Sequence, residues 1–348
     1  MTSTGPAVER ARDVLQVNDL KVYYETSKGD VKAVDGVSFS LRPGERLGLI
    51  GESGSGKTTI AMALMRLTRA PGRIVGGRVL LDGRDLLAMS DRELRRVRLK
   101  EIALVPQGAM NSLNPVMRIW DQIVDGVLAH EPGRHSRTEL EKRVVRLLER
   151  VGLESSVAER YPHELSGGMK QRAVMAIATS LDPKVIIADE PTSALDVVVQ
   201  RQVMLTLGRV QEGLGAAVVL VGHDMGLMAQ FADIVGVMYA GRLVEVGPVE
   251  QLLTEPRHPY TRLLIDSLPA LDEKRKLRGI PGLPPMLVDM PVGCAFNPRC
   301  PLQHDRCRTE TPDLLQVGPD RQVSCHLYPE HSALPPVREK RAQAGAIL

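Results

Sequence analysis

The sequence predicts an α/β fold: a parallel sheet with crossover helices, followed by a small loop-rich C-terminal domain. A short apolar segment, Arg46–Ile50, leads into a Gly-rich loop and a helix, which is typical of a buried parallel strand. Strand and helix patterns alternate from residue 185 to 239, the order expected for a parallel sheet. Beyond about residue 270 prolines become frequent and all four cysteines occur, which indicates a second unit.

The N-terminal strands are predicted from runs rich in Val, Tyr and Phe. Leu15–Tyr24 and Val31–Leu41 have this composition, and Gly29-Asp30 is the predicted turn between them. Arg73–Leu81 is the strand expected after the Gly-rich loop and its helix.

The middle of the chain, residues 117–182, is predicted to be mostly helical. Thr138–Val151 carries Leu and Val at helical spacing, and Gly152 ends that helix. The alternating elements that follow are the strands Val185–Ala188, Ala216–Val221 and Ile234–Tyr239 and the helices Val197–Glu212 and Met225–Phe231.

The change in composition near residue 270 sets the expected domain boundaries. We expect a nucleotide-binding domain over 13–270, with a helical subdomain at about 108–182, and a cysteine-rich domain over 271–333. Residues 334–348 are expected to be a frayed tail.

Composition excludes several classes of function. The net charge of +3 over 348 residues and the aromatic content of 3% disfavour a nucleic-acid-binding protein. No apolar run approaches the roughly 20 residues that a membrane-spanning helix needs. The polar N-terminus lacks a secretory core, so we expect a cytoplasmic protein whose membrane spans, where it needs them, belong to partners.

The Gly-rich loop, residues 51–58, matches the phosphate-binding pattern G-x-x-x-x-G-K-[ST]. Its glycines let backbone N–H groups surround phosphate oxygens, and the helix N-terminus adds positive potential. Lys57 is expected to reach the β- and γ-phosphates, and Thr58 to bind Mg²⁺. The predicted ATP contacts of this segment are Gly51, Ser53, Gly54, Ser55, Gly56, Lys57, Thr58 and Thr59.

Two acids end the apolar strand at residues 185–188. Asp189 is expected to hold Mg²⁺, and Glu190 to act as the general base on the attacking water. The alternative is an acidic strand end in solvent, which is a weaker interpretation beside a phosphate loop.

A second helix N-terminus offers another anion site. Ser166 is placed to cap the helix, while Gly167 and Gly168 leave the backbone accessible to phosphate oxygens. The alternative is a capped surface helix that binds no ligand.

These three motifs together resemble the ABC ATPase family over residues 15–260 or so. The resemblance implies a P-loop core with a mixed sheet, an antiparallel β edge and a helical subdomain. It also implies that two such domains pack head to tail, each ATP lying between one phosphate loop and the other domain's Ser-Gly-Gly.

Further site residues follow from the same resemblance. Tyr24 corresponds to the aromatic residue that stacks on adenine, with Tyr23 as the alternative. Gln107 resembles the glutamine that contacts Mg²⁺ and water. Asp196 ends a loop that crosses the dimer interface and contacts ATP, and His223 resembles the histidine that contacts the γ-phosphate.

Two later segments, 108–115 and 258–264, resemble ATPases of dipeptide and oligopeptide importers, and so does the tail at 280–282 and 293–301. Gly108 and Ala109 replace the acidic residue and proline usual after the glutamine. This subfamily also includes carriers of nickel chelates, glutathione and oligosaccharides, so the cargo stays open.

The cysteines Cys294, Cys300, Cys307 and Cys325 have the spacing C-x5-C-x6-C-x17-C. Structural zinc usually uses C-x2-C pairs, which are absent here. A loop-rich set of four thiolates suits a [4Fe–4S] cluster, as relatives with this tail imply. Zinc and free thiols are the alternatives.

The resulting hypothesis is an ATP-hydrolysing motor of a peptide importer, using ATP and Mg²⁺, with Glu190, His223 and Gln107 as catalytic residues. The expected partners are a paralogous ATPase, two transmembrane permease subunits and an extracytoplasmic substrate-binding protein, with no nucleic acid. The expected location is the cytoplasmic face of the cell membrane. The alternative from another class is a soluble ABC ATPase that acts on nucleic acid or ribosomes.

Overall fold

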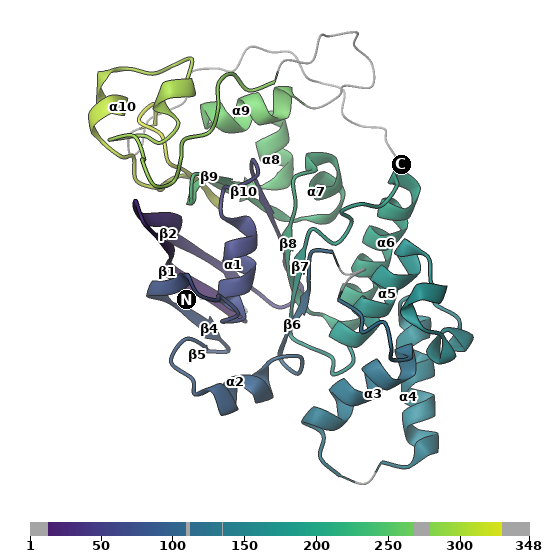
Figure 1. Ribbon diagram of the computed structural model, residues 1–348. Helices are drawn as coiled ribbons and strands as arrows, with labels where there is room; N and C mark the ends of the chain where they lie inside the picture. Colours follow the sequence, from purple (N-terminus) through teal and green to yellow (C-terminus); the bar gives the residue numbers. More distant parts are fainter. Residues whose placement is uncertain (1–12, 109–111, 134, 268–278, 329–348) are drawn as a thin grey trace, which may run out of the picture.

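The computed structural model describes residues 13–108, 112–133, 135–267 and 279–328. In this part of the chain two β-sheets lie on either side of helix α1 (Lys57–Leu64), and a group of helices forms a separate lobe (Figure 1). The first sheet is antiparallel, in the order β2-β1-β4-β5. Its strands are β1 (Leu15–Thr26), β2 (Gly29–Leu41), β4 (Gly72–Leu81) and β5 (Arg84–Asp85).

The second sheet carries the site. Its order among the described residues is β11-β12-β10-β9-β3-β8-β7-β6, and the strands from β9 to β6 run parallel. Both β7 and β8 are buried at every residue because helices and the first sheet cover both faces. The strands are β3 (Arg46–Ile50), β6 (Ile102–Val105), β7 (Val185–Asp189), β8 (Ala217–Val221), β9 (Ile234–Tyr239), β10 (Arg242–Pro248), β11 (Leu315–Gly318) and β12 (Arg321–Val323).

The helices fall into three groups. The lobe below and to the right in Figure 1 contains α3 (Ile119–His130), α4 (Arg137–Arg150), α5 (Gly167–Ala178) and the short turns η2 (Ser155–Glu159) and η3 (Pro162–Glu164). Against the second sheet lie α6 (Val197–Leu214), α7 (Met225–Phe231), α8 (Val249–Thr254) and α9 (Pro259–Asp266), with α2 (Asp91–Val97) below the first sheet. The C-terminal segment adds η4 (Asn297–Arg299) and α10 (Asp305–Thr309).

Local sequence explains where the helices of the lobe begin. At α4, Ser136 accepts a hydrogen bond from the Glu139 N–H, and the Glu139 carboxylate accepts one from the Ser136 N–H, so this is a capping box.

None of the described helices is long and apolar enough to cross a bilayer.

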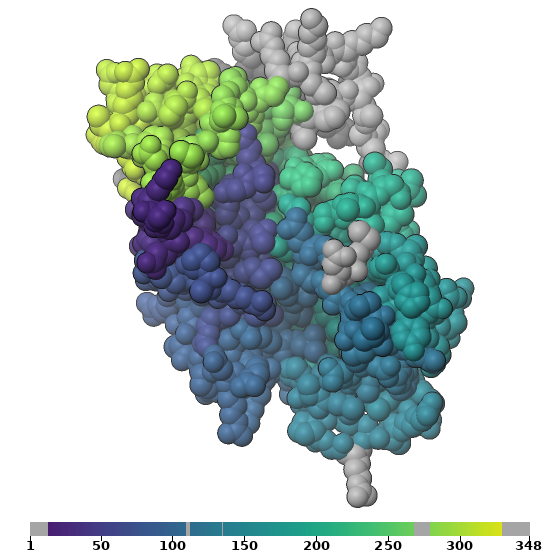
Figure 2. Space-filling model, in the orientation of Figure 1, coloured from purple at the N-terminus to yellow at the C-terminus, as the bar shows by residue number. Residues whose placement is uncertain are grey.

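The C-terminal segment is continuous with the second sheet rather than detached from it. Strand β12 pairs with β10, and the Arg321 guanidinium contacts the Glu245 carboxylate at 2.9 Å in a fully buried ion pair. Figure 2 shows this segment, in yellow-green, lying over one end of the molecule beside the purple N-terminal strands. In the same segment Arg299, the residue before Cys300, contacts Glu52 of the phosphate loop.

The predicted fold class is confirmed, with differences at particular elements. The turn predicted at Gly29-Asp30 is wrong by two residues: Ser27 and Lys28 form it, and Gly29 begins β2 in a positive-φ conformation of 118°. Strands β6 and β10 were not predicted, since short buried strands lack a diagnostic period. The boundary expected near residue 270 and the tail 334–348 lie outside the described residues, so the domain division stays a prediction.

Candidate functional site

The phosphate loop joins the end of β3 to the start of α1, and two of its glycines are sterically required. Gly51 and Gly56 have φ of 150° and 102°. A Cβ on Gly51 would lie 2.2 Å from the Met238 carbonyl oxygen, and one on Gly56 would lie 2.1 Å from that of Ala33. Only glycine allows the backbone to pass this close to its neighbours, which explains the pattern physically.

Lys57, the first residue of α1, points back into the loop. Its Nζ donates to the carbonyls of Gly51 and Glu52 at 2.8 and 2.9 Å. Burial lowers the pKa of Lys57, while the nearby carboxylates of Glu190 and Asp189 raise it. The ammonium therefore lies inside the loop, where a bound phosphate would be.

Thr58 and Asp189 form the expected Mg²⁺ pair. The Thr58 hydroxyl donates to Asp189 Oδ1 at 3.1 Å. Asp189 is fully buried, and its Oδ2 has no hydrogen-bond partner among the described residues. Burial raises the pKa of Asp189 to about 6. A buried carboxylate oxygen without a partner, beside a hydroxyl and a phosphate loop, fits a divalent cation.

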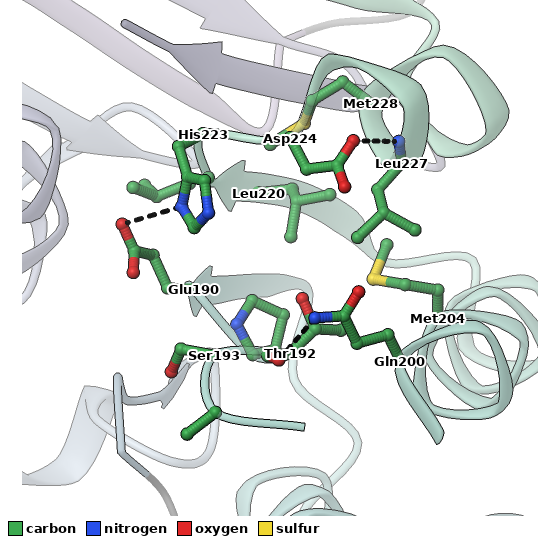
Figure 3. A pocket seen from close by; sticks show the side chains of 14 residues that line it. Glu190, Thr192, Ser193, Gln200, Met204, Leu220, His223, Asp224, Leu227 and Met228 are labelled. Atoms are coloured by element: carbon green, nitrogen blue, oxygen red, sulfur yellow. Dashed lines mark hydrogen bonds and ion pairs between the residues drawn. The ribbon is translucent and has the colours of Figure 1, made fainter. Parts of the chain in front are cut away.

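The Glu190 carboxylate lies beside two polar side chains, those of Gln107 and His223. Gln107 Nε2 donates to its Oε2 at 2.9 Å, and His223 Nδ1 lies 3.6 Å from its Oε1. Figure 3 shows Glu190 and His223 facing each other from the ends of β7 and β8, beside a cavity of about 150 Å³. Glu190 has a positive φ of 43°, a strained conformation for this residue type and one that is common at functional sites.

The loop after Glu190 leads to α6. Asp196 caps this helix by accepting from the Val199 N–H at 3.0 Å, so its side chain has a structural role in the single chain. Val197 and Val198 in the first turn are each 79% exposed. The contact of Asp196 with ATP stays a prediction.

Ser166 and the two glycines lie at the N-terminus of α5, in the helical lobe and away from α1 (Figure 1). Ser166 is exposed and caps the helix through the Met169 N–H at 3.3 Å. Gly168 is buried, and a Cβ there would lie 2.5 Å from a methyl of Val199. Gly168 therefore also has a packing role that the motif alone did not indicate.

The two candidate tyrosines point to opposite faces of β1 because strand side chains alternate. The Tyr23 hydroxyl donates to Asp35 at 2.7 Å, and burial and this bond raise the pKa of Tyr23 to about 12. The Tyr24 ring packs over Gly72. The Tyr23 hydroxyl is thus occupied by its hydrogen bond to Asp35, and Tyr24 stays the residue predicted to stack on adenine.

The cysteines surround one hollow. Cys294, Cys300, Cys307 and Cys325 are free thiols that line it together with His326. Burial raises the pKa of Cys325 to about 12. Among the described residues no group of three or more His, Cys, Asp or Glu side chains is gathered tightly enough for one metal ion. The four thiols thus share one hollow without the close spacing that a single metal ion needs.

Two residues of the site were missed in the sequence. Arg299 lies in η4 between two cysteines and contacts Glu52 of the phosphate loop. Glu52 occupies a variable position of the loop pattern, and the two residues are 247 positions apart. No sequence signal pairs them.

Comparison with known proteins shows the class of protein to which the chain belongs. Residues 34–193 match the family described as ABC transporter, and residues 244–307 match the C-terminal region of oligopeptide/dipeptide transporters. The dimeric, post-hydrolysis structure of the ATP-binding cassette MJ0796 bound to ADP and Pi superposes with a TM-score of 0.61. It is 27% identical, and the match covers 68% of this chain and 98% of that one.

Relatives that match over nearly their whole length show to which branch of the family the chain belongs. The dipeptide transport ATP-binding protein DppD of Caldanaerobacter subterraneus subsp. tengcongensis is 43% identical, covering 91% of this chain and 98% of the relative. The oligopeptide transport ATP-binding protein OppD of Salmonella typhimurium is 42% identical, covering 92% and 95%. The chain belongs to the ABC transporter family, among the ATP-binding subunits of its dipeptide/oligopeptide branch. It hydrolyses ATP in a transport cycle.

Proposed function

We propose that this chain is the motor subunit of a membrane importer for dipeptides or oligopeptides, at the cytoplasmic face of the cell membrane. The observation that carries the proposal is the convergence of Lys57, Thr58, Asp189 and Glu190 at the carboxyl ends of β3 and β7. Peptide cargo is supported by the printed names of the relatives DppD and OppD.

In this proposal each residue has a defined task. The loop N–H groups and Lys57 bind the ATP phosphates, and Lys57 exchanges its carbonyl partners for phosphate oxygens. Glu190 accepts a proton from the attacking water, while Gln107 and His223 hold that water and the γ-phosphate. Thr58, Asp189 and Gln107 would hold Mg²⁺, which when bound neutralises the developing phosphate charge.

A second ATPase completes the site. Ser166–Gly168 lies in the helical lobe, away from the phosphate loop, so in this proposal it serves a nucleotide held by a partner chain. We propose a paralogous ATPase as that partner, two transmembrane permeases contacting the region of residues 107–120, and an extracytoplasmic binding protein. Part of that region, 109–111, lies outside the described residues.

Two substitutions test the chemistry. Glu190→Gln keeps a similar shape but removes the base, so ATP turnover falls about 10²- to 10⁴-fold while ATP still binds. Lys57→Ala abolishes tight ATP binding. The matched control is Glu212→Gln. Glu212 lies on α6 and forms an exposed ion pair with Arg46, so this variant keeps full activity. Normal turnover in Glu190→Gln would refute the assignment of the base.

The cargo needs a separate experiment. The chain is co-expressed with candidate permease subunits and assembled in vesicles. ATP-dependent uptake of a dipeptide is then compared with that of a nickel chelate, glutathione and an oligosaccharide. Dipeptide uptake supports the proposal. Co-purification with nucleic acid or ribosomes instead of permeases would favour the soluble alternative.

We further propose that the four cysteines hold a [4Fe–4S] cluster, with zinc as the alternative. Support comes from the four free thiols around one hollow, since thiolates are the ligands that such clusters use. Anaerobically purified protein is analysed for iron, acid-labile sulfide and zinc. Zinc without iron would overturn the cluster assignment.

A further inference from the structure

Arg299, in the cysteine-rich segment, forms an ion pair with Glu52 of the phosphate loop. The Arg299 guanidinium contacts both carboxylate oxygens of Glu52, at 2.7 Å and 2.9 Å. Its side chain is only 5% exposed, whereas the arginines of other ion pairs among the described residues, such as those at Arg73, Arg137 and Arg306, are more than half exposed. A bidentate pair whose arginine is buried fixes both direction and distance.

Arg299 is itself held rigidly. It ends η4, in which the Arg299 N–H donates to Phe296 O, and the Cys300 N–H donates to Asn297 O. The guanidinium lies 5.8 Å from the ring centre of Tyr239 and 5.9 Å from that of Phe296. Its position is therefore set by the short loop that runs between Cys294 and Cys300.

The backbone of Glu52 is hydrogen-bonded to groups in and around the phosphate loop. Its backbone N–H donates to the Tyr260 hydroxyl at 2.9 Å. Its carbonyl accepts from Lys57 Nζ at 2.9 Å and from the Ser55 N–H at 3.2 Å. The carboxylate that Arg299 holds and the carbonyl that orients Lys57 therefore belong to the same residue of the loop.

The contact is not needed to attach the C-terminal segment. That segment is already joined to the core by the β10–β12 pairing and by the buried pair of Arg321 and Glu245. Loss of the Arg299 contact should thus alter the loop without detaching the segment.

We propose that Arg299 is a positioning residue for ATP: through Glu52 it holds the phosphate loop in its binding geometry, so that the Cys294–Cys300 loop sets nucleotide affinity. This inference rests on the proposed nucleotide site. It gives the cysteine-rich segment a direct physical route to the motor. A change in that loop would reach Lys57 through two residues.

The test compares Arg299→Met, Glu52→Gln and the double variant in the full-length chain. The KM for ATP and the dissociation constant of a fluorescent ATP analogue should rise roughly 5- to 50-fold in each single variant, with kcat little changed. The double variant should be no worse than either single one, because both remove the same contact. Arg299→Lys should recover part of the affinity.

The matched control is Arg306→Met, which removes an exposed ion pair with Glu310 in the same segment and should change neither constant. Additive effects of Arg299→Met and Glu52→Gln, or unchanged ATP affinity in both, would overturn the inference. Thermal unfolding of Glu52→Gln separates loss of affinity from loss of fold. If Lys57→Ala also leaves ATP affinity intact, the proposed nucleotide site fails as well; if only the Arg299 variants are neutral, the inference fails alone.

Discussion

Substitution of Arg321 should destabilise the junction between the C-terminal segment and the ATPase core. Glu245 is completely buried and accepts from the N–H groups of Arg257 and His258 and from the Arg321 guanidinium, each at 2.9 Å. Arg321→Met preserves most of the side-chain volume but leaves the Glu245 carboxylate without its counter-charge in a site closed to water.

The expected cost follows from that burial. Removing one partner of a buried ion pair typically costs about 3–5 kcal/mol, because the remaining charge stays desolvated. At about 2 °C per kcal/mol for a chain of this size, the melting temperature should fall by roughly 6–10 °C. Since Glu245 also pairs with Val323 in the β10–β12 ladder, the loss should appear first in the C-terminal segment.

The assay is calorimetric or denaturant unfolding combined with hydrogen exchange at the Ser324 amide, which donates to the Val244 carbonyl at 2.8 Å. Arg306→Met serves as the control because its ion pair is exposed, and exposed pairs contribute about 0–1 kcal/mol. Replacing both Arg321 and Glu245 with methionine should cost less than the sum of the two single changes. A loss below about 1 kcal/mol in Arg321→Met would refute this reasoning.

Three shorter predictions concern the loop, the helical lobe and pH. Gly56→Ala should destroy ATP binding, because its Cβ would meet a backbone oxygen at 2.1 Å. Gly213→Ala, on α6, has open space around its Cβ and no positive φ, so it should keep binding, as titration with a nucleotide analogue will show. Gly168→Ala should lower stability by about 1–3 kcal/mol in denaturant unfolding, since its Cβ would press on α6. The hydrogen bond from Arg143 lowers the pKa of the Glu131 carboxyl in the folded state. The stability that the pair contributes is therefore fully present above the pKa of the unfolded carboxyl, and it is lost as pH falls through the lower pKa of the folded state. Arg143→Met should therefore lose less stability between neutral and acidic pH than the unsubstituted chain, measured by urea unfolding at each pH.

Much of the candidate site could be predicted because its chemistry lies in short contiguous motifs. The phosphate loop needs glycine at positions where a Cβ would strike a carbonyl, so Gly51 and Gly56 are visible in the sequence itself. Asp189 and Glu190 end an apolar strand, and parallel strands direct their carboxyl ends to one edge, which brings them to the loop. The separate helix N-terminus at Ser166 was also apparent from its cap and glycines.

Other features depend on contacts between distant segments. The turn predicted at Gly29-Asp30 was displaced because strand pairing, rather than the glycine alone, decides which residues form a two-residue hairpin loop. The buried strands β6 and β10 were missed because a short apolar run has no period that separates strand from helix.

The sequence by itself determined the class of protein, its phosphate loop and its acidic pair, because each of these is a local pattern whose backbone geometry dictates its residues. Only the tertiary structure decided that β12 joins the core sheet, that Tyr23 is committed to Asp35, and that Arg299 reaches Glu52. The physical reason is that such pairings depend on how the chain packs across many residues, and neither partner carries a local signal for the other.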